Sequence, residues 1–402
     1  MKSNKWTTIA ALSLTFLGGS SAFANTNDAL LDLLVKKGVL TKQEATEVAE
    51  EVERNKAADK QTESDREIAF SAKGKETIKL RFNGRMQAQY DALSMEENGT
   101  DLPSTNHFYF RRLFLGAKAE LENGMYAETV LDFAGDENPD IAFDKAVFGY
   151  AFNDALNARM GYQKVPFGFE ETSSSSKLPA IERSAANRFF ADDIDFSSRH
   201  TGLHATGALG NGFRYAGAFV NAAQGEGSRL LGSSNASNDM AAFGRLQWQS
   251  NDLTLGVDGG TQSNNSVVND DVTAFTGYVN YKMNGLDLLG EYFTADMEDA
   301  EDVDGYALRA SYRLDKFEPV VRYAHLKADS FEIDSDELIR RAPSGGTVSG
   351  TDNEIDSFYV GLNYYISPAV TFMAGYEYAE AENAQGADVE INGFRSRLQL
   401  LW

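Results

Sequence analysis

Apolar and polar residues alternate along one short segment after another from Glu76 to the C-terminal Trp402. In the first segment one parity is apolar, with Ile78, Leu80, Phe82, Met86, Ala88 and Tyr90. The other parity is polar, with Lys79, Arg81, Asn83, Arg85, Gln87 and Gln89. A period of two is the pattern of a β-strand whose two faces meet different surroundings, whereas a helix repeats every ~3.6 residues. Because the pattern recurs throughout this range, the sequence predicts an all-β fold.

The alternating segments number about sixteen, and many reach the ~9–11 residues that a tilted membrane strand needs. They begin near Glu76, His107, Gly124, Ile141, Ala155, Ser197, Gly212, Asp239, Asp252, Asp271, Leu286, Asp302, Phe317, Ile355, Ala369 and Val389. Tight connectors such as Asn153-Asp154 alternate with long polar ones at 92–106, 224–238 and 329–354. This arrangement predicts a transmembrane antiparallel β-barrel of about sixteen strands, wide enough for a water-filled lumen.

The N-terminal residues have the three parts of a secretory signal peptide, which we expect at residues 1–24. Lys2 and Lys5 precede an apolar run, and small residues end it at Ala22-Phe23-Ala24. The apolar run is shorter than the ~20 residues of a membrane-spanning helix. No later segment of the sequence approaches that length, so a membrane-spanning chain must form a closed barrel. We therefore expect export to the outer membrane of a Gram-negative-type bacterium.

Residues 25–70 follow a helical rather than a strand period. Apolar residues recur at helical spacing from Leu30 to Val52, and Thr41 with Glu44 matches a capping box after Gly38. We expect a short periplasmic helical segment here, followed by the barrel at 71–402. A coiled coil that trimerises or tethers the barrel is one interpretation, and a frayed amphipathic arm is the other.

The composition excludes several classes of function. The chain has no cysteine, which excludes disulfides, thiolate catalysis and thiolate-bound metals. A formal net charge of −23 argues against nucleic acid as a partner, because phosphate contacts need a basic face. None of the four histidines lies in a metal or phosphate-loop motif. We expect no enzyme, no cofactor and no metal, although abundant serine keeps an outer-membrane hydrolase as an alternative.

Two parts of the chain carry longer motifs. The first is Phe110-Arg111-Arg112-Leu113-Phe114-Leu115-Gly116-Ala117-Lys118-Ala119-Glu120-Leu121. The second is Gly161-Tyr162-Gln163-Lys164-Val165-Pro166-Phe167, followed by Glu170-Glu171-Thr172-Ser173-Ser174 and Glu182-Arg183-Ser184. Both resemble the phosphate-selective porin O/P family, over roughly Phe82 to Phe219. The resemblance implies a barrel of sixteen strands, usually a homotrimer, with an inward-folded loop and inward basic residues that bind phosphate or pyrophosphate.

The connector at 165–196 is the candidate for that loop, because connectors of this length usually have a function. The alternative is an external loop without a role in conduction. Candidates for the pore constriction and for anion binding are Lys164, Arg183, Arg188, Arg111, Arg112, Lys118 and Arg159. Adjacent Arg111 and Arg112 cannot both point inward on a regular strand, so we expect one of them near a membrane boundary or at a β-bulge.

The acidic balance of the chain leaves the ion selectivity open. Basic residues of the lumen parity are Lys79, Arg81, Arg85, Arg159, Arg245, Arg309, Arg313, Arg395 and Arg397. Many acids lie in connectors, and charges beyond a Debye length of ~8 Å are screened, so a locally positive pore is compatible with an acidic chain. Inward acids such as Glu128, Asp132 and Asp258 would instead pair with the arginines.

We therefore expect a porin for passive diffusion of small hydrophilic solutes, with an anion or phosphate preference. A general or cation-preferring porin is the alternative, and a structural tether acting through the N-terminal helical arm is a second one. Trp402 ends an amphipathic strand and resembles the signal that the barrel-assembly machinery reads. The expected partners are outer-membrane lipid, small anions or other hydrophilic solutes, that machinery, and further copies of the chain in a homotrimer.

Overall fold

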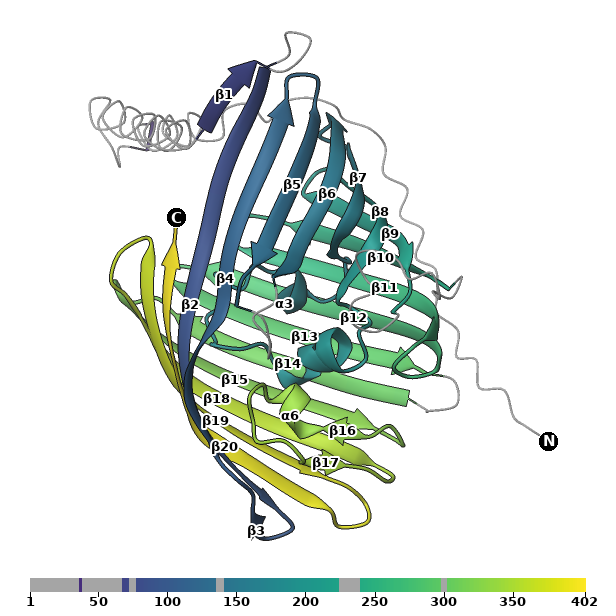
Figure 1. Ribbon diagram of the computed structural model, residues 1–402, viewed down its shortest axis with the longest axis vertical. Coiled ribbons are helices and arrows are strands. Elements are labelled where there is room, and N and C mark those ends of the chain that lie inside the picture. The colour runs from purple at the N-terminus through teal and green to yellow at the C-terminus, as the bar shows by residue number, and fades with distance from the viewer. Residues whose placement is uncertain (1–35, 38–66, 72–76, 135–140, 224–238, 298–301) are drawn as a thin grey trace, which may run out of the picture. The chain divides into compact units, whose positions relative to one another are not determined.

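The computed structural model describes residues 36–37, 67–71, 77–134, 141–223, 239–297 and 302–402. The signal peptide predicted at 1–24 lies outside these residues, as does nearly all of the helical segment predicted at 25–70. The chain divides into Met1–Arg66 and Glu67–Trp402, and every strand described below belongs to the second part (Figure 1). Its first strand, β1, spans Glu67–Ser71, so the end of the range 25–70 is extended rather than helical.

Sixteen long strands pair antiparallel with their sequence neighbours and close into a barrel. They are β2 Thr77–Glu97, β4 Thr105–Leu121, β5 Met125–Asp132, β6 Ala142–Asn153, β7 Leu156–Lys164, β8 Arg199–Gly210, β9 Phe213–Asn221, β10 Met240–Gln249, β11 Leu253–Asn265, β12 Asp270–Met283, β13 Leu286–Asp296, β14 Asp302–Tyr312, β15 Phe317–Ala328, β18 Asn353–Tyr365, β19 Val370–Glu382 and β20 Asp388–Leu401. The predicted starts of all sixteen lie within two residues of these bounds. The barrel prediction is confirmed.

The ring closes because β2 pairs with β20 on one edge and with β4 on the other. The backbone of Trp402 exchanges two hydrogen bonds with Gly84 on β2, at 2.9 and 3.2 Å. Its indole also covers Gly84, since a Cβ at this glycine would lie 2.1 Å from the ring. The last residue of the sequence therefore contributes directly to the closure of the barrel.

The predicted loop at 92–106 is shorter than expected. β2 continues to Glu97 and β4 starts at Thr105, with the short strand β3 at Thr100–Asp101 between them. Leu93 and Met95 keep the inward parity of β2 and are fully buried. They belong to the same apolar cluster as residues of the connector 329–352, so packing inside the barrel extends the strand beyond the range that the polar composition suggested.

Short elements occupy two of the connectors. Between β7 and β8 lie α3 Phe169–Thr172, α4 Ala185–Arg188 and the π-helical turn η1 Phe189–Asp193. Between β15 and β18 lie β16 Ile333–Asp334, α6 Ser335–Leu338 and β17 Thr347–Val348, where β16 and β17 form a small separate sheet (Figure 1). Among the described residues, no helix is long and apolar enough to cross a membrane.

The two faces of the barrel wall differ as the alternation predicts. Outward side chains are apolar and about half exposed, such as Leu308 at 53% and Val360 at 57%. Inward neighbours on the same strands are polar and buried, such as Arg309 and Ser357. An apolar outer band with a polar interior is the arrangement of a membrane barrel around a lumen.

Residues 165–198, called the lumen loop below, fold into the barrel as predicted for this connector. At one end Phe167, Phe190 and Phe196 are fully buried and pack on Phe243 and Phe293 of the wall. At the other, Ala180 and Ile181 pack against Val320, Tyr359 and Met373. Apolar contacts therefore hold the loop against two different parts of the wall, which fixes its path across the lumen.

Candidate functional site

A β-bulge in β4 turns two adjacent arginines into the lumen. Gln87 pairs with Arg112 and the next residue, Ala88, pairs with Phe110, so Arg111 is an extra residue on its strand. Arg111 Nε donates to Glu182 Oε1 of the lumen loop at 3.0 Å, and Arg112 Nη1 donates to Gln87 Oε1 at 3.0 Å. A bulge lets successive side chains share one face. Of the two alternatives expected for this pair, a membrane boundary or a β-bulge, the structure shows the bulge.

A second bulge acts in the same way on β6. Val130 pairs with Lys145 and Leu131 pairs with Phe143, which leaves Asp144 as the extra residue. Asp144 forms an ion pair with Arg199, and Lys145 forms one with Glu128 at 2.8 Å. The alternation of apolar and polar residues did not predict this bulge, because Asp144 and Lys145 are both polar and either of them could be the inward residue.

Three glutamates of the lumen loop bind basic residues. Glu170 pairs with Arg309 at 3.3 Å, and Glu171 pairs with Lys164 and, at 2.9 Å, with Arg183 of the loop itself. All three carboxylates, including Glu182, are at most 4% exposed. Buried ion pairs of this kind order a segment, because removing one partner leaves the other charge buried and uncompensated.

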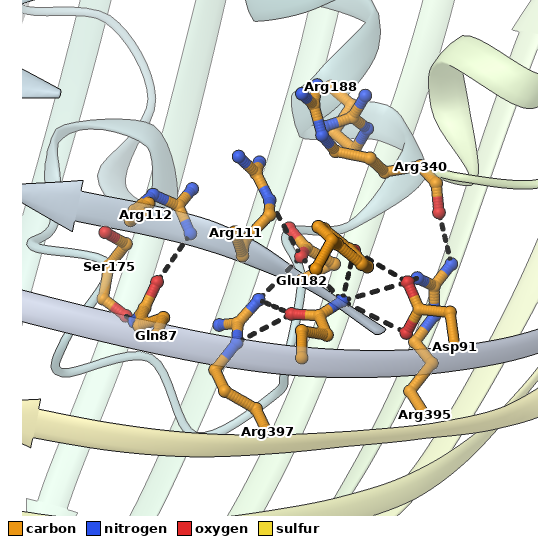
Figure 2. A network of polar contacts seen from close by, with 12 residues as sticks. Gln87, Asp91, Arg111, Arg112, Ser175, Glu182, Arg188, Arg340, Arg395 and Arg397 are labelled. Atoms are coloured by element: carbon orange, nitrogen blue, oxygen red, sulfur yellow. Dashed lines mark hydrogen bonds and ion pairs between the residues drawn. The ribbon is translucent and has the colours of Figure 1, made fainter. Parts of the chain in front are cut away.

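Glu182 lies in a network of charges that we call the arginine cluster, formed by Arg111, Arg322, Arg395, Arg397, Asp91, Glu182 and Glu377. Figure 2 shows Asp91, Arg111, Glu182, Arg395 and Arg397 of this cluster. Arg397 Nη2 contacts Glu182 at 2.6 Å, and Arg395 contacts Asp91 at 3.1 Å and Glu377 at 2.7 Å. Burial raises the pKa of the Glu182 carboxyl, but the guanidinium groups of Arg111 and Arg397 outweigh it and hold the pKa well below its ordinary value. Glu182 is therefore ionised at neutral pH.

A cavity of about 630 Å³ lies beside this cluster, between the lumen loop and the inner faces of β2 and β4–β10. We call it the basic cavity. Its basic lining residues are Arg85, Arg112, Lys145, Arg159, Lys164, Arg183, Arg199 and Arg245, and its acidic ones are Glu128 and Asp144. The loop adds the backbone and hydroxyl groups of Ser173, Ser174, Ser175 and Ser176. The described lining thus carries eight basic side chains against two carboxylates.

The bases of this cavity fall into two groups. Lys145, Lys164, Arg183, Arg199 and Arg245 form ion pairs with carboxylates. Arg85, Arg112 and Arg159 instead donate to neutral groups, namely Ser174 Oγ at 3.3 Å, Gln87 Oε1 at 3.0 Å and Thr206 Oγ1 at 3.3 Å. A guanidinium that donates to a neutral group has a charge that no carboxylate balances, and its remaining N–H donors can bind an incoming anion.

The predicted site residues are only partly brought together. Lys164, Arg183, Arg112 and Arg159 line the basic cavity, and Arg111 belongs to the arginine cluster. Lys118 pairs with Glu120 on its own strand and is not part of the cavity lining. Arg188 pairs with Asp192 at 2.9 Å and donates through Nε to the Glu337 carbonyl at 2.7 Å, so it joins the lumen loop to the connector 329–352.

Other lining residues had weaker signals in the sequence. Arg85 and Arg245 were predicted to point into the lumen, but the sequence did not distinguish them from the other inward basic residues. Arg199 was missed, because it is the first residue of β8 and no alternation precedes it. His200 and His204 lie on the same face of β8, and both are buried. Among the described residues, no group of three or more histidines or carboxylates is placed to hold a metal ion.

A closed barrel of this size with an apolar outer face and a loop across its lumen defines an outer-membrane channel of the porin type. The anion-selective porin from Comamonas acidovorans has this fold with a TM-score of 0.57 and 13% identity, covering 81% of this chain and 100% of that one. The channel DcaP of Acinetobacter baumannii has a TM-score of 0.57 and 11% identity, covering 83% and 99%. OmpT of Vibrio cholerae in its trimer form has a TM-score of 0.54 and 13% identity, covering 81% of this chain and 99% of that one.

The chain belongs to the family "Phosphate-selective porin O and P", whose model matches residues 80–287, more than half of the sequence. This confirms the resemblance that the Phe110–Leu121 and Gly161–Ser184 motifs indicated. A curated relative, an uncharacterized protein of Aquifex aeolicus, is 28% identical over an alignment of 174 residues, and the match covers 39% of this chain. The aligned part spans 37% of that relative's length.

Proposed function

We propose that this porin prefers anions and binds phosphate-like oxyanions in the basic cavity. The observation that carries the proposal is the lining itself, where Arg85, Arg112 and Arg159 donate to neutral groups while the other basic residues are paired with carboxylates. Fixed charges decide ion selectivity where a pore is narrow, and low-dielectric walls focus their field. Anions entering the cavity therefore meet a positive potential.

The strongly acidic composition of the chain is compatible with this preference. Much of the acidic charge lies near the connectors, for example Asp329, Asp334, Asp336 and Glu337 between β15 and β18. In physiological salt, exposed charges further away than ~8 Å are largely screened from the cavity. Local charge rather than the total of −23 then sets the selectivity.

The donor types in the cavity suit a tetrahedral oxyanion. Guanidinium groups bind phosphate through two parallel N–H donors, and serine hydroxyls add further donors. Arg85 and Ser174 already lie within hydrogen-bonding distance of each other, at 3.3 Å. The family's description as phosphate-selective and the anion selectivity of the Comamonas porin support the same preference.

The test is conductance of the folded protein in a planar bilayer across a KCl gradient, with phosphate added stepwise. We expect an anion-side reversal potential and saturable block by phosphate. Arg159→Gln should raise the phosphate concentration for half-block, whereas the control Arg81→Gln removes the same charge outside the cavity lining, where Arg81 contacts Glu120, and should not. A cation-side reversal potential without phosphate block would instead identify a general or cation-preferring porin.

Further parts of the prediction belong to the same proposal. We propose that the chain forms a homotrimer, which the trimeric OmpT with the same fold supports. We also propose that the barrel-assembly machinery recognises Trp402. Cross-linking in the membrane should yield trimers, and deletion of Trp402 should reduce assembly in the cell. We also propose a channel without enzymatic activity, so the purified protein should leave lipid and peptide substrates intact.

A further inference from the structure

Glu182 differs in origin from the other two carboxylates of the arginine cluster. Asp91 and Glu377 belong to the wall strands β2 and β19, whereas Glu182 is brought in by the lumen loop. The arginines Arg111, Arg322, Arg395 and Arg397 also come from wall strands. The loop therefore inserts a negative charge among cations that the barrel wall already holds in place.

The site that receives this carboxylate is built from three separate strands. Arg111 Nε on β4, Arg397 Nη2 on β20 and Gln89 Nε2 on β2 all donate to the single oxygen Oε1, at 3.0, 2.6 and 3.3 Å. Arg397 also donates to Gln89 Oε1, which orients the amide. Converging donors on rigid strands, themselves held by neighbouring groups, are what an oxyanion-binding site requires.

We propose that Glu182 is an internal ligand, whose carboxylate fills an oxyanion site formed by Arg111, Arg397 and Gln89 and withholds that site from permeating anions. Its significance for anion conduction rests on the proposed function. The expected response to removing Glu182 does not rest on the proposed function. That response depends only on this site and is expected for a porin of either selectivity.

Other contacts also hold the lumen loop at this position. Arg322 Nη1 on β15 donates to the backbone carbonyl of Glu182 at 2.6 Å, and Ile181 packs in the apolar cluster beside it. On the following side, Ser184 N donates to Glu170 Oε2 at 2.9 Å. Substituting the side chain therefore leaves the backbone contacts around position 182 in place.

Removing the carboxylate changes the local balance of charge. The cluster has four arginines against three carboxylates, and without Glu182 it has four against two. Arg397 is 1% exposed, and a buried guanidinium without a partner attracts a counter-ion strongly. The vacated site should therefore bind a small carboxylate from solution.

The experiment uses the full-length folded porin with Glu182→Ala, which leaves space, and Glu182→Gln, which keeps the volume. Reversal potentials across a KCl gradient are measured with increasing sodium formate. We expect both variants to shift towards anions, and formate to reverse the shift saturably in Glu182→Ala but not in Glu182→Gln. Glu120→Ala, which removes a lumen carboxylate paired with Lys118, is the matched control and should show no saturable formate response.

Each outcome decides the proposal. Without an anion-side shift in folded Glu182→Gln, or without a saturable formate response in folded Glu182→Ala, Glu182 is not an internal ligand. If Glu182→Ala does not fold, formate during refolding should recover it, and failure to do so together with an unshifted Glu182→Gln also overturns the proposal. A cation-preferring wild type whose Glu182→Ala variant still responds to formate would overturn the proposed function alone.

Discussion

The arginine cluster and the basic cavity use the same side chain in two different settings. In the cluster, Arg395 and Arg397 are almost completely buried and contact carboxylates at 2.6 to 3.1 Å. In the cavity, Arg85 and Arg159 donate to hydroxyl groups and line open space. The comparison shows that the number of inward arginines does not predict selectivity, because a paired arginine positions the loop while one with neutral partners remains available to a solute.

The two regions also differ in what a lost charge should do. Removing a cluster arginine deprives a buried carboxylate of an ion-pair partner, which is a large cost to the fold. Removing a cavity arginine leaves a hydroxyl that water can satisfy, so its main effect should be on solute binding. Stability and phosphate affinity should therefore change separately in the two regions.

The largest effect is expected for Arg397→Gln in the arginine cluster. Glu182 would lose its 2.6 Å partner while it remains 4% exposed, and breaking a buried pair costs about 3–5 kcal/mol. We expect this loss in the unfolding free energy measured by urea titration in lipid vesicles, together with noisier single-channel currents as the lumen loop loosens. Arg159→Gln in the cavity is the control, and an equal loss of stability there would remove the distinction between the two regions.

A smaller effect is expected for Arg85→Gln in the basic cavity. A charge-assisted hydrogen bond contributes about 1.5–3 kcal/mol, which corresponds to a ~10- to 100-fold weaker phosphate block. The unfolding free energy should change little, because Arg85 donates to the exposed Ser174 Oγ. Arg313→Gln provides a comparison within the lumen parity, since Arg313 stacks on Tyr365 and is not part of the cavity lining. Equal weakening of the block by both variants would point to long-range charge instead of binding in the cavity.

The sequence predicted the strands of the barrel wall well, but it predicted poorly which inward charges pair with one another. Strand starts and inward parity follow from local alternation, and the adjacent Arg111 and Arg112 indicated either a membrane boundary or a bulge. Which inward charges meet depends on the path of the lumen loop, and contacts such as Glu182 with Arg397 join residues far apart in the chain. Arg188 illustrates the difference: its position beside a family motif suggested the constriction, but the loop directs it towards the connector 329–352.

The connector 329–352 is a third region to compare. Its contact with the lumen loop is acidic, whereas the cavity is basic. Burial raises the pKa of Asp193 well above its ordinary value, and Asp334, Glu337 and Glu332 raise it further, against Arg188. Burial and the neighbouring Asp334 raise the pKa of Asp336 to about 7. Asp192 lies on the same turn and pairs with Arg188.

The smallest effect is expected from the titration of this contact. A carboxyl whose pKa is raised in the docked arrangement favours docking while it is protonated, and that contribution is lost as the pH rises through the raised pKa. For Asp336 this places the change near pH 7, with its hydrogen-bonded contact to Asp334 in the connector stabilised below that pH and weakened above it. Single-channel conductance should therefore increase from pH 6 to pH 8, and Asp336→Asn, which cannot ionise, should reduce that increase. The same pH dependence in Asp336→Asn and wild type would assign the change to other groups of the pore.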